Sequence, residues 1–569
     1  MEILNGGTAL TLVICAALAG AGRPERPAAI CDGKIVSAID ITPRDPSFVA
    51  VPHQLRGVAR AIGVIHTTST RQTISHFLLL QVGQPCTERH RAESERILRL
   101  QPFLADATVL AVPDSAGGVR IEVETIDEIP TVVDMRVRGK RISQVRFGNA
   151  NVGGQGLYLA GNVEQGLAYR TGFELHAVAN QLFGQPQVLE LVAERSPVGS
   201  ELTVGFGQAF VTDLQRSAWH VGISDINRYV SFSPPDGDAL SLEVRRQLWD
   251  VGRVRRIGGR HRSAFVGGLV THEDVRSANQ FVVVSDSGLL ATNGLHLIDS
   301  VVPFRNVRLN AVAGVRALSF MTVRGFDALR AVQDVAVGTQ LGVLIGRTVG
   351  RFGSSDDDVF AAADFYGGVG SATSFAAVRL DGEARDDRRA NDWDSMIGSG
   401  RLAWYRKPAP AHVLISSLEF AGARNERVPF QLMLGDRQGG VRGYSASRDA
   451  GALRGVARVE ERWSIGGLTS HDALGVASFV DVGRVWAGDA PFGVTSRAKV
   501  GIGAGLLAAF PPQSQRLWRL DVAVPASPDP NAHWELRLTG TWTRRFWREP
   551  DDVARGRSGA APSAIFTWP

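Results

Sequence analysis

The chain has 569 residues, of which 44% are apolar and 63 are glycines, and its formal net charge is +5. This composition is typical of an ordered protein rich in strands and turns, and it excludes a disordered one. No block of Lys and Arg concentrates the charge, which argues against a nucleic-acid partner. Three cysteines are too few for a dense disulfide scaffold or a cysteine-rich zinc site.

The first residues are typical of an export signal. An apolar run from Ala9 to Leu18 ends at a small-residue cleavage site, Ala17-Leu18-Ala19, although Glu2 stands where such signals usually carry Lys or Arg. We therefore predict a signal peptide over residues 1–19. No later stretch reaches the ~20 apolar residues of a membrane-spanning helix. The mean hydropathy of −0.01 fits a membrane barrel as well as a soluble protein.

Residues 31–130 combine strand and helix patterns. Lys34 to Ile41 and Val119 to Ile126 alternate between apolar and polar residues, as half-buried strands do. Thr87 to Leu100 is rich in helix formers and begins with a threonine that can cap a helix. The order of strand, helices, strand and strand predicts a small α+β domain.

From Ile142 onward, short apolar and polar alternations recur between turn-rich segments. In Leu517 to Val524 and in Trp534 to Trp547, one face is mostly apolar and the other is polar and carries charges, which fits a water-filled lumen better than a dry core. At about 25 residues per strand and connection, residues 142–547 would hold sixteen strands. We predict a mainly β fold: a 16-stranded antiparallel transmembrane β-barrel preceded by a small α+β domain. A soluble all-β enzyme is the alternative.

The end of the chain has two features. Trp542, Phe546 and Trp547 suit an aromatic girdle at a membrane interface. Residues 548–569 then continue as a C-terminal tail beyond the last expected strand.

Three separated motifs occur in the expected barrel. Val441-Arg442-Gly443-Tyr444 is followed by five expected strands, "SFVDVGRVW" at Ser478 to Trp486 contains the pattern F-x-D-x-G, and "NVGGQG" covers Asn151 to Gly156. Thr73 to Val112 resembles a POTRA domain. Together these stretches resemble the BamA/TamA-type outer-membrane assembly barrels, also called the bacterial surface antigen family, here with a single POTRA domain. The tail departs from that family, whose barrels usually end on an aromatic residue of the last strand.

The resemblance places Val441–Tyr444 in the sixth outer loop, folded into the lumen. By strand alternation, Phe479, Asp481 and Gly483 share one face, so Asp481 points inward and can take a bidentate bond from Arg442. Gly443 would give the loop tip its backbone freedom and Tyr444 an amphipathic wedge. We predict an Arg442–Asp481 latch; a solvated arginine on a surface loop is the alternative.

A second "VRGF" at Val323 to Phe326 is predicted to be a strand end or turn. Glu460 and Arg462 share a strand face and are predicted to line the lumen. Glu461 then faces lipid, where a bulge or a place near the interface would relieve it.

Cys31 and Cys86 both follow the expected signal. In an oxidising periplasm we expect a disulfide between them, with two free buried thiols as the alternative. The sequence has no G-x-S-x-G, H-E-x-x-H or Walker motif, so we predict no enzyme, no cofactor and no metal site.

The resemblance implies a protein of the bacterial outer membrane, with its POTRA domain in the periplasm, that inserts or assembles other β-barrels. Its partners would be the lipid bilayer, unfolded β-barrel clients and periplasmic accessory proteins, with no nucleic acid. The POTRA edge would receive client strands, and a weak seam between the first strand, near Ile142 to Phe147, and the last would template insertion. The alternatives are a two-partner secretion pore exporting an unfolded protein and a plain transport barrel.

Overall fold

The computed structural model describes most of the chain after the expected signal peptide. The described residues are 31, 33–46, 68–115, 117–138, 141–167, 170–259, 262–285, 288–292, 302–387, 392–435, 439–469, 471–530, 532–542 and 549–557. The predicted signal peptide, residues 1–19, and the side chains of Trp542, Phe546 and Trp547 therefore lie outside the described part.

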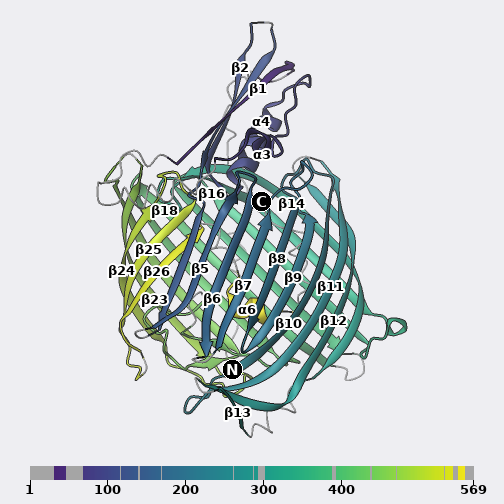
Figure 1. Ribbon diagram of the computed structural model, residues 1–569, viewed down its shortest axis with the longest axis vertical. Helices are drawn as coiled ribbons and strands as arrows, with labels where there is room; N and C mark the ends of the chain where they lie inside the picture. Colours follow the sequence, from purple (N-terminus) through teal and green to yellow (C-terminus); the bar gives the residue numbers. More distant parts are fainter. Residues whose placement is uncertain are drawn as a thin grey trace, which may run out of the picture.

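The N-terminal part is an α+β module that projects from one end of a large barrel (Figure 1). Its elements are β1 (Val36–Arg44), α3 (Arg71–Ser75), α4 (Glu88–Arg99), β2 (Leu104–Pro113) and β3 (Val119–Asp127). The sheet has the order β1-β3-β2, with β1 parallel and β2 antiparallel to β3. None of the described helices is long and apolar enough to span a membrane.

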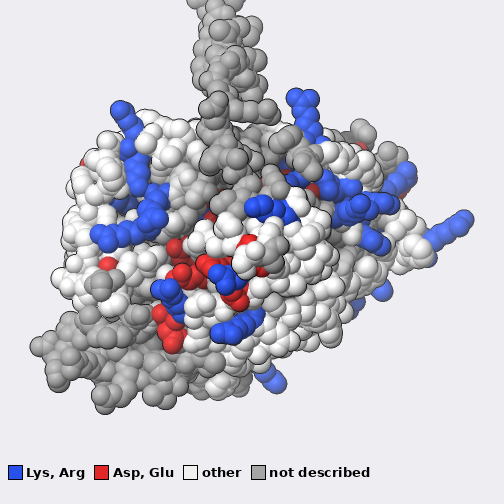
Figure 2. All heavy atoms as spheres, turned by 90° about the horizontal axis from the view of Figure 1, so that it is seen from above, with Lys and Arg blue, Asp and Glu red and all other residues white. Residues whose placement is uncertain are grey.

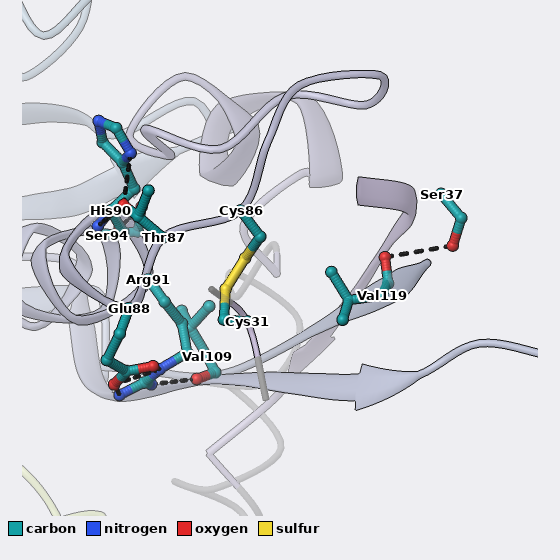
Figure 3. The surroundings of a disulfide bond; sticks show 10 residues. All are labelled: Cys31, Ser37, Cys86, Thr87, Glu88, His90, Arg91, Ser94, Val109 and Val119. Atoms are coloured by element: carbon teal, nitrogen blue, oxygen red, sulfur yellow. Dashed lines mark hydrogen bonds and ion pairs between the residues drawn. A yellow bond between two sulfur atoms is a disulfide. The ribbon is translucent and has the colours of Figure 1, made fainter. Parts of the chain in front are cut away.

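Local sequence explains helix α4. The Thr87 hydroxyl accepts the backbone N–H of His90 at the N-terminus, and basic Arg96 and Arg99 occupy the last turn, where they complement the helix dipole. The side chains of Ile97 and Leu98 are buried in the module core. Cys31 and Cys86 form a disulfide beside the start of this helix, with their Cα atoms 5.2 Å apart (Figure 3).

Side chains of α4 also cover one edge of the module sheet. The backbone N–H of Val109, on edge strand β2, donates to Glu95 Oε2 at 3.0 Å, and Arg91 donates to the Val109 carbonyl oxygen (Figure 3). Arg99 reaches the carbonyl oxygen of Ala107 at 3.4 Å. These main-chain groups are the ones that an added strand would use, so this stretch of β2 is capped by ionic side chains.

The rest of the described chain forms a closed antiparallel barrel, so the predictions of a mainly β chain and of antiparallel strands are confirmed. Its strands in chain order are β4 (Thr131–Arg138), β5 (Arg141–Val152), β6 (Leu157–Leu167), β7 (Arg170–Ala179), β8 (Val188–Ser196), β9 (Gly199–Gln208), β10 (Ser217–Phe232), β11 (Leu240–Gly258), β12 (Ser263–Ser285), β13 (Gly288–Thr292), β14 (Phe304–Arg324), β15 (Val332–Thr348), β16 (Asp358–Gly370), β17 (Ser374–Asp387), β18 (Asp392–Ala409), β19 (His412–Arg424), β22 (Leu453–Gly466), β23 (Ala473–Trp486), β24 (Lys499–Ala509), β25 (Arg516–Pro525) and β26 (Glu535–Trp542). Sequential neighbours pair, and β26 and β4 are neighbours where the barrel closes.

The strand count differs from the predicted sixteen. The closed order contains twenty-one described strand segments, of which the five-residue β13 only extends the hairpin at the C-terminal end of β12. The barrel sheet also begins at β4, before the expected boundary at residue 142. Strands β4 to β9 are only 8 to 12 residues long and several are joined by tight turns, so this region uses far fewer residues per strand than the estimate assumed.

Alternation separates an apolar outer face from a polar inner face. On β23 the side chains of Phe479 and Asp481 are buried, whereas Val480 and Val482 are 44% and 38% exposed. On the inner face, Arg385 pairs with Glu273 at 2.7 Å although both are almost fully buried. A belt of exposed aliphatic and aromatic residues around charged, paired interior groups fits a membrane barrel with a polar lumen.

The module is tied to the barrel by named contacts. Asp127 accepts the backbone N–H of Ser69 at 2.7 Å, and Asn151, near the end of β5, donates to the Ser69 hydroxyl at 2.9 Å. Gly154, in the turn between β5 and β6, has φ +69°, and a Cβ added there would lie 2.3 Å from the carbonyl oxygen of Thr68. The "NVGGQG" stretch is therefore glycine-rich because the module backbone approaches it closely.

A second contact point lies farther around the rim. Arg99 of α4 forms a bidentate pair with Asp334 of β15, at 2.9 and 3.0 Å. Glu128 accepts the Ser514 hydroxyl at 2.8 Å in the β24–β25 connection. Seen from the module end, Figure 2 shows acidic side chains gathered near the middle of this face, with some basic side chains among them and more toward its edges.

Candidate functional site

The connection between β19 and β22 carries the Val441–Tyr444 motif. It contains the short pair β20 (Leu432–Met433) and β21 (Ala450–Gly451), and it starts at the barrel end away from the module. Five strands, β22 to β26, follow it, as the sequence indicated. Counted from β4, it is the eighth connection at that end rather than the sixth, because the additional strands all precede it.

The loop places Arg442 against the barrel wall. Its Nε and Nη2 lie 2.7 and 2.8 Å from the two carboxylate oxygens of Asp481 on β23, and its backbone N–H donates to the same carboxylate at 3.2 Å. The guanidinium carbon lies 3.4 Å from the ring centroid of Phe479. Asp481 is 0% exposed, so this pair is fixed in a water-poor environment.

The wall is shaped to receive the loop backbone. A Cβ added at Gly483 would lie 2.4 Å from Val441 Cγ2, and one added at Gly501 of β24 would lie 2.1 Å from the Arg442 carbonyl oxygen. Val441 itself is 0% exposed. Gly483, the glycine of the F-x-D-x-G pattern, therefore leaves a notch in the wall, and any larger residue at this position would fill it.

Tyr444 extends the contact toward the last strands. Its hydroxyl lies 3.0 Å from the Val500 carbonyl oxygen and 2.9 Å from that of Ser527, and it accepts the Ser527 N–H at 3.0 Å. Gly443, with φ +89°, donates its N–H to Glu535 Oε2 at 3.0 Å, and Glu535 is the first residue of β26. The loop therefore contacts the strand that closes the barrel.

Glu460 is the centre of the charged network. Its carboxylate accepts hydrogen bonds from the guanidinium groups of Arg442 at 3.1 Å, of Arg462 at 2.5 Å, and of Arg519 on β25 at 2.8 and 3.0 Å. Arg519 also pairs with Asp521 at 3.1 Å. Removing one member of such a buried group leaves charges without partners, so the network defines a position for the loop more than it adds stability.

The structure brings Glu460 and Arg462 together on the inner face, where they were expected. Glu461 lies on the opposite face and pairs with His412 at 2.6 Å, near the turn between β18 and β19. Trp463 stacks on the same imidazole at 5.3 Å between centroids. The outward carboxylate is therefore paired at a strand end, without a bulge at this residue.

The second motif, Val323–Phe326, lies at the module end. Strand β14 ends at Arg324, and the following turn buries Phe326, which is 1% exposed and packs on Tyr405 at 5.3 Å between centroids. The Asp327 carboxylate accepts a hydrogen bond from the Tyr405 hydroxyl at 2.7 Å, and the Asp327 backbone carbonyl oxygen accepts one from the Arg462 guanidinium at 2.8 Å. Burial raises the pKa of Asp327 to about 6 although the Tyr405 hydrogen bond opposes this.

The sequence did not identify every residue of this site. Arg519 and Asp521 were assigned to the inner face by strand alternation, but their contacts with the motif network required the fold. Glu535 was likewise assigned to the polar face of the last strand, but its contact with Gly443 had no sequence signal, because that contact depends on which loop rests on β26. Among the described residues, no cluster of three or more His, Cys, Asp or Glu side chains could hold a metal ion.

Comparisons with known proteins give no assignment. No family model matches the chain, and no curated protein matches it. Among solved structures, BamA from Haemophilus ducreyi lacking POTRA domains 1–3 is 11% identical, with 89% of this chain and 84% of that chain covered and a TM-score of 0.37. CdiB from Escherichia coli is 13% identical, with 92% and 94% covered and a TM-score of 0.37. CdiB from Acinetobacter baumannii is 10% identical at the same coverage and TM-score. These likenesses define neither a family nor an activity for the chain.

Proposed function

We propose that the chain is a barrel of the bacterial outer membrane that inserts or assembles other β-barrel proteins, with its α+β module in the periplasm. The observation that carries the proposal is the loop at Arg442, which is locked to β23 and contacts β26 beside the barrel closure. A transport pore has no need of a loop fixed to its closing strand, whereas a barrel that opens laterally needs its closed state to be held.

The seam itself supports this function. The strands that meet at the closure are β4 and β26, and the Arg442 loop contacts β26 through the hydrogen bond from Gly443 to Glu535. Opening at this junction would release that contact and expose two strand edges that a client strand could join by main-chain hydrogen bonds. The seam is thus proposed between β4 and β26, rather than at residues 142–147.

The module would receive clients through its sheet edge. The capped stretch Ala107–Val109 of β2 adds a condition: Arg91 and Glu95 must swing away before a client strand can pair there. Bilayer lipid around the apolar belt and periplasmic accessory proteins complete the proposed partners.

Depletion followed by quantitative proteomics of outer membrane and culture medium tests the proposal. Broad loss of other barrels from the membrane is the expected result. Loss of one secreted protein, with the membrane set unchanged, would instead identify a two-partner secretion pore.

Complementation then links the activity to the site. Arg442→Ala should fail to restore the membrane barrels, whereas Arg324→Ala, in the second motif, should restore them. Arg324 is a matched control because it occupies the same motif position but is exposed. Equal restoration by both variants would separate the loop from the activity.

A further inference from the structure

The chain does not end at the last barrel strand. Helix α6 (Asp551–Gly556) lies in the interior of the barrel in Figure 1. No sequence pattern pointed to this position, since residues 548–569 were expected only to be a tail. The described part of that tail, residues 549–557, is bound to the lumen wall by charged, apolar and polar contacts.

The charged contact joins Asp552 to Arg454 of β22. Arg454 Nη2 lies 3.1 Å from Asp552 Oδ1, Nη1 contacts the second carboxylate oxygen, and both side chains are at most 5% exposed. Arg454 Nη1 also donates to the Met433 carbonyl oxygen at 2.9 Å. The same guanidinium therefore holds both the tail and the loop that carries Arg442.

The apolar contact is formed by Val553. It is 0% exposed and belongs to a cluster with Ile397, Ala421 and Leu432, from β18, β19 and the loop. A Cβ added at Gly556 would lie 2.8 Å from Ile397 Cδ1, so the helix rests closely on the wall. An acidic side chain followed by an aliphatic one thus matches a cationic group beside an apolar patch.

Polar contacts anchor the segment at two distant places. Glu549 accepts the Ser399 hydroxyl of β18 at 3.0 Å and pairs with Arg557 at 2.6 Å. Arg246 of β11 donates to the Arg557 carbonyl oxygen at 2.8 Å. Strands β11 and β22 are separated in the barrel order by eight others, the strands β12 to β19. The segment therefore bridges well-separated parts of the wall and crosses the lumen.

We propose that the lumen wall around Arg454, Ile397, Ala421 and Leu432 is a peptide-binding site for a short segment with an acidic residue followed by an aliphatic one. Residues 549–557 occupy this site in the resting protein and close the lumen. A chain segment of the same chemistry that enters the lumen competes for Arg454 and displaces the tail. Because Arg454 also holds Met433, displacement weakens the hold on the Arg442 loop. This site does not depend on whether the barrel is an insertase or a secretion pore.

Conductance of the full-length chain in planar lipid bilayers tests the proposal. Asp552→Arg should raise the open fraction at least ~10-fold, because it faces Arg454 with a like charge. Arg454→Asp combined with Asp552→Arg should restore the closed state. Ala554→Arg introduces the same side chain at an exposed position of the same helix and should change the open fraction less than ~2-fold. Equal conductance of wild type and Asp552→Arg would overturn the proposal.

A synthetic nine-residue peptide with the sequence of residues 549–557 tests binding in trans. Added to the Asp552→Arg variant, it should lower conductance toward the wild-type level, and the same peptide with Asp552→Asn should need at least ~10-fold more. Block by both peptides alike, or by neither, would contradict the site. If Asp552→Arg does not fold, Gly556→Cys with Ile397→Cys decides in its place. The oxidised pair should show fewer openings than wild type, and reduction should restore the wild-type open fraction. Wild type and Ile397→Cys alone should respond to reductant less than the pair does; an oxidised pair that opens as often as wild type overturns the proposal.

Discussion

Two nearly identical tetrapeptides, Val441–Tyr444 and Val323–Phe326, lie in opposite environments. In the first, the arginine is buried and bound to carboxylates, and it enters the lumen from the end away from the module. In the second, Arg324 is exposed at the end of a strand, and Phe326 packs on Phe375 and Tyr405 at the module end. The tetrapeptide sequence alone therefore does not define a functional site.

What differs is the wall opposite each motif. The first faces an inward carboxylate flanked by an aromatic ring and a glycine notch, at Phe479, Asp481 and Gly483. The second packs into an aromatic cluster, where the buried carboxylate, Asp327, accepts a hydrogen bond from the Tyr405 hydroxyl. The two are nevertheless connected: Arg462 contacts Glu460 of the first network and the Asp327 carbonyl oxygen beside the second motif.

Exchange of the two arginines for alanine should separate the motifs most strongly. Arg442→Ala leaves Asp481 and Glu460 buried with fewer partners and should cost ~3–5 kcal/mol, with protease cleavage in the 425–452 connection. Arg324→Ala should cost less than ~0.5 kcal/mol. Unfolding in detergent and limited proteolysis measure both. Similar losses of unfolding free energy for the two variants would show that the environment of the arginine does not determine its contribution to stability.

The second motif should respond to pH through Asp327. Its folded pKa of about 6 exceeds the unfolded value of about 4, so the associated stability is fully present below pH 4 and is lost as pH rises through about 6. The loss is at most ~3 kcal/mol. Asp327→Asn should flatten the change in melting temperature between pH 4 and 7. Tyr405→Phe should shift it to higher pH, because the Tyr405 hydrogen bond lowers this pKa. An unchanged profile in Asp327→Asn would refute the assignment.

The notch opposite the first motif should tolerate no side chain. Gly483→Ala places a methyl group 2.4 Å from Val441 Cγ2 and should cost ~1–3 kcal/mol by displacing the loop. Gly161→Ala is the control, since its added Cβ meets only one atom, at 4.0 Å. Loop position can be followed by cysteine accessibility at Ser445. Equal accessibility in the two variants would mean that the wall accommodates the methyl group.

Sequence reasoning succeeded where chemistry repeats along a strand. Alternation alone oriented Asp481 inward, and counting strands back from the C-terminus placed five after Tyr444. It failed where the structure depends on long-range contacts. Strands of 8 to 12 residues joined by tight turns, such as β4 to β9, carry weak periodic signals, so the count was too low and β4 was missed. The position of residues 549–557 in the lumen depends on Arg454 and Arg246. These arginines are far from the tail in the sequence, and no local sequence pattern distinguishes them.

Exchange of the aromatic residues between the two motifs should have the smallest effect. It tests most directly whether the contacts around each motif determine which aromatic residue is tolerated there. Tyr444→Phe turns the first motif into the second and removes the partner of the Ser527 N–H, at a cost of ~1–2 kcal/mol. Phe326→Tyr makes the reverse change and puts a hydroxyl into a cluster of aromatic rings, at a similar cost unless it finds a polar partner. Unfolding of both single variants in detergent measures this. If the motif sequence alone determined the structure, both variants would keep the stability of the wild type, because each change produces a motif that occurs naturally in this chain. If the residues that contact each motif determine it, both variants lose stability.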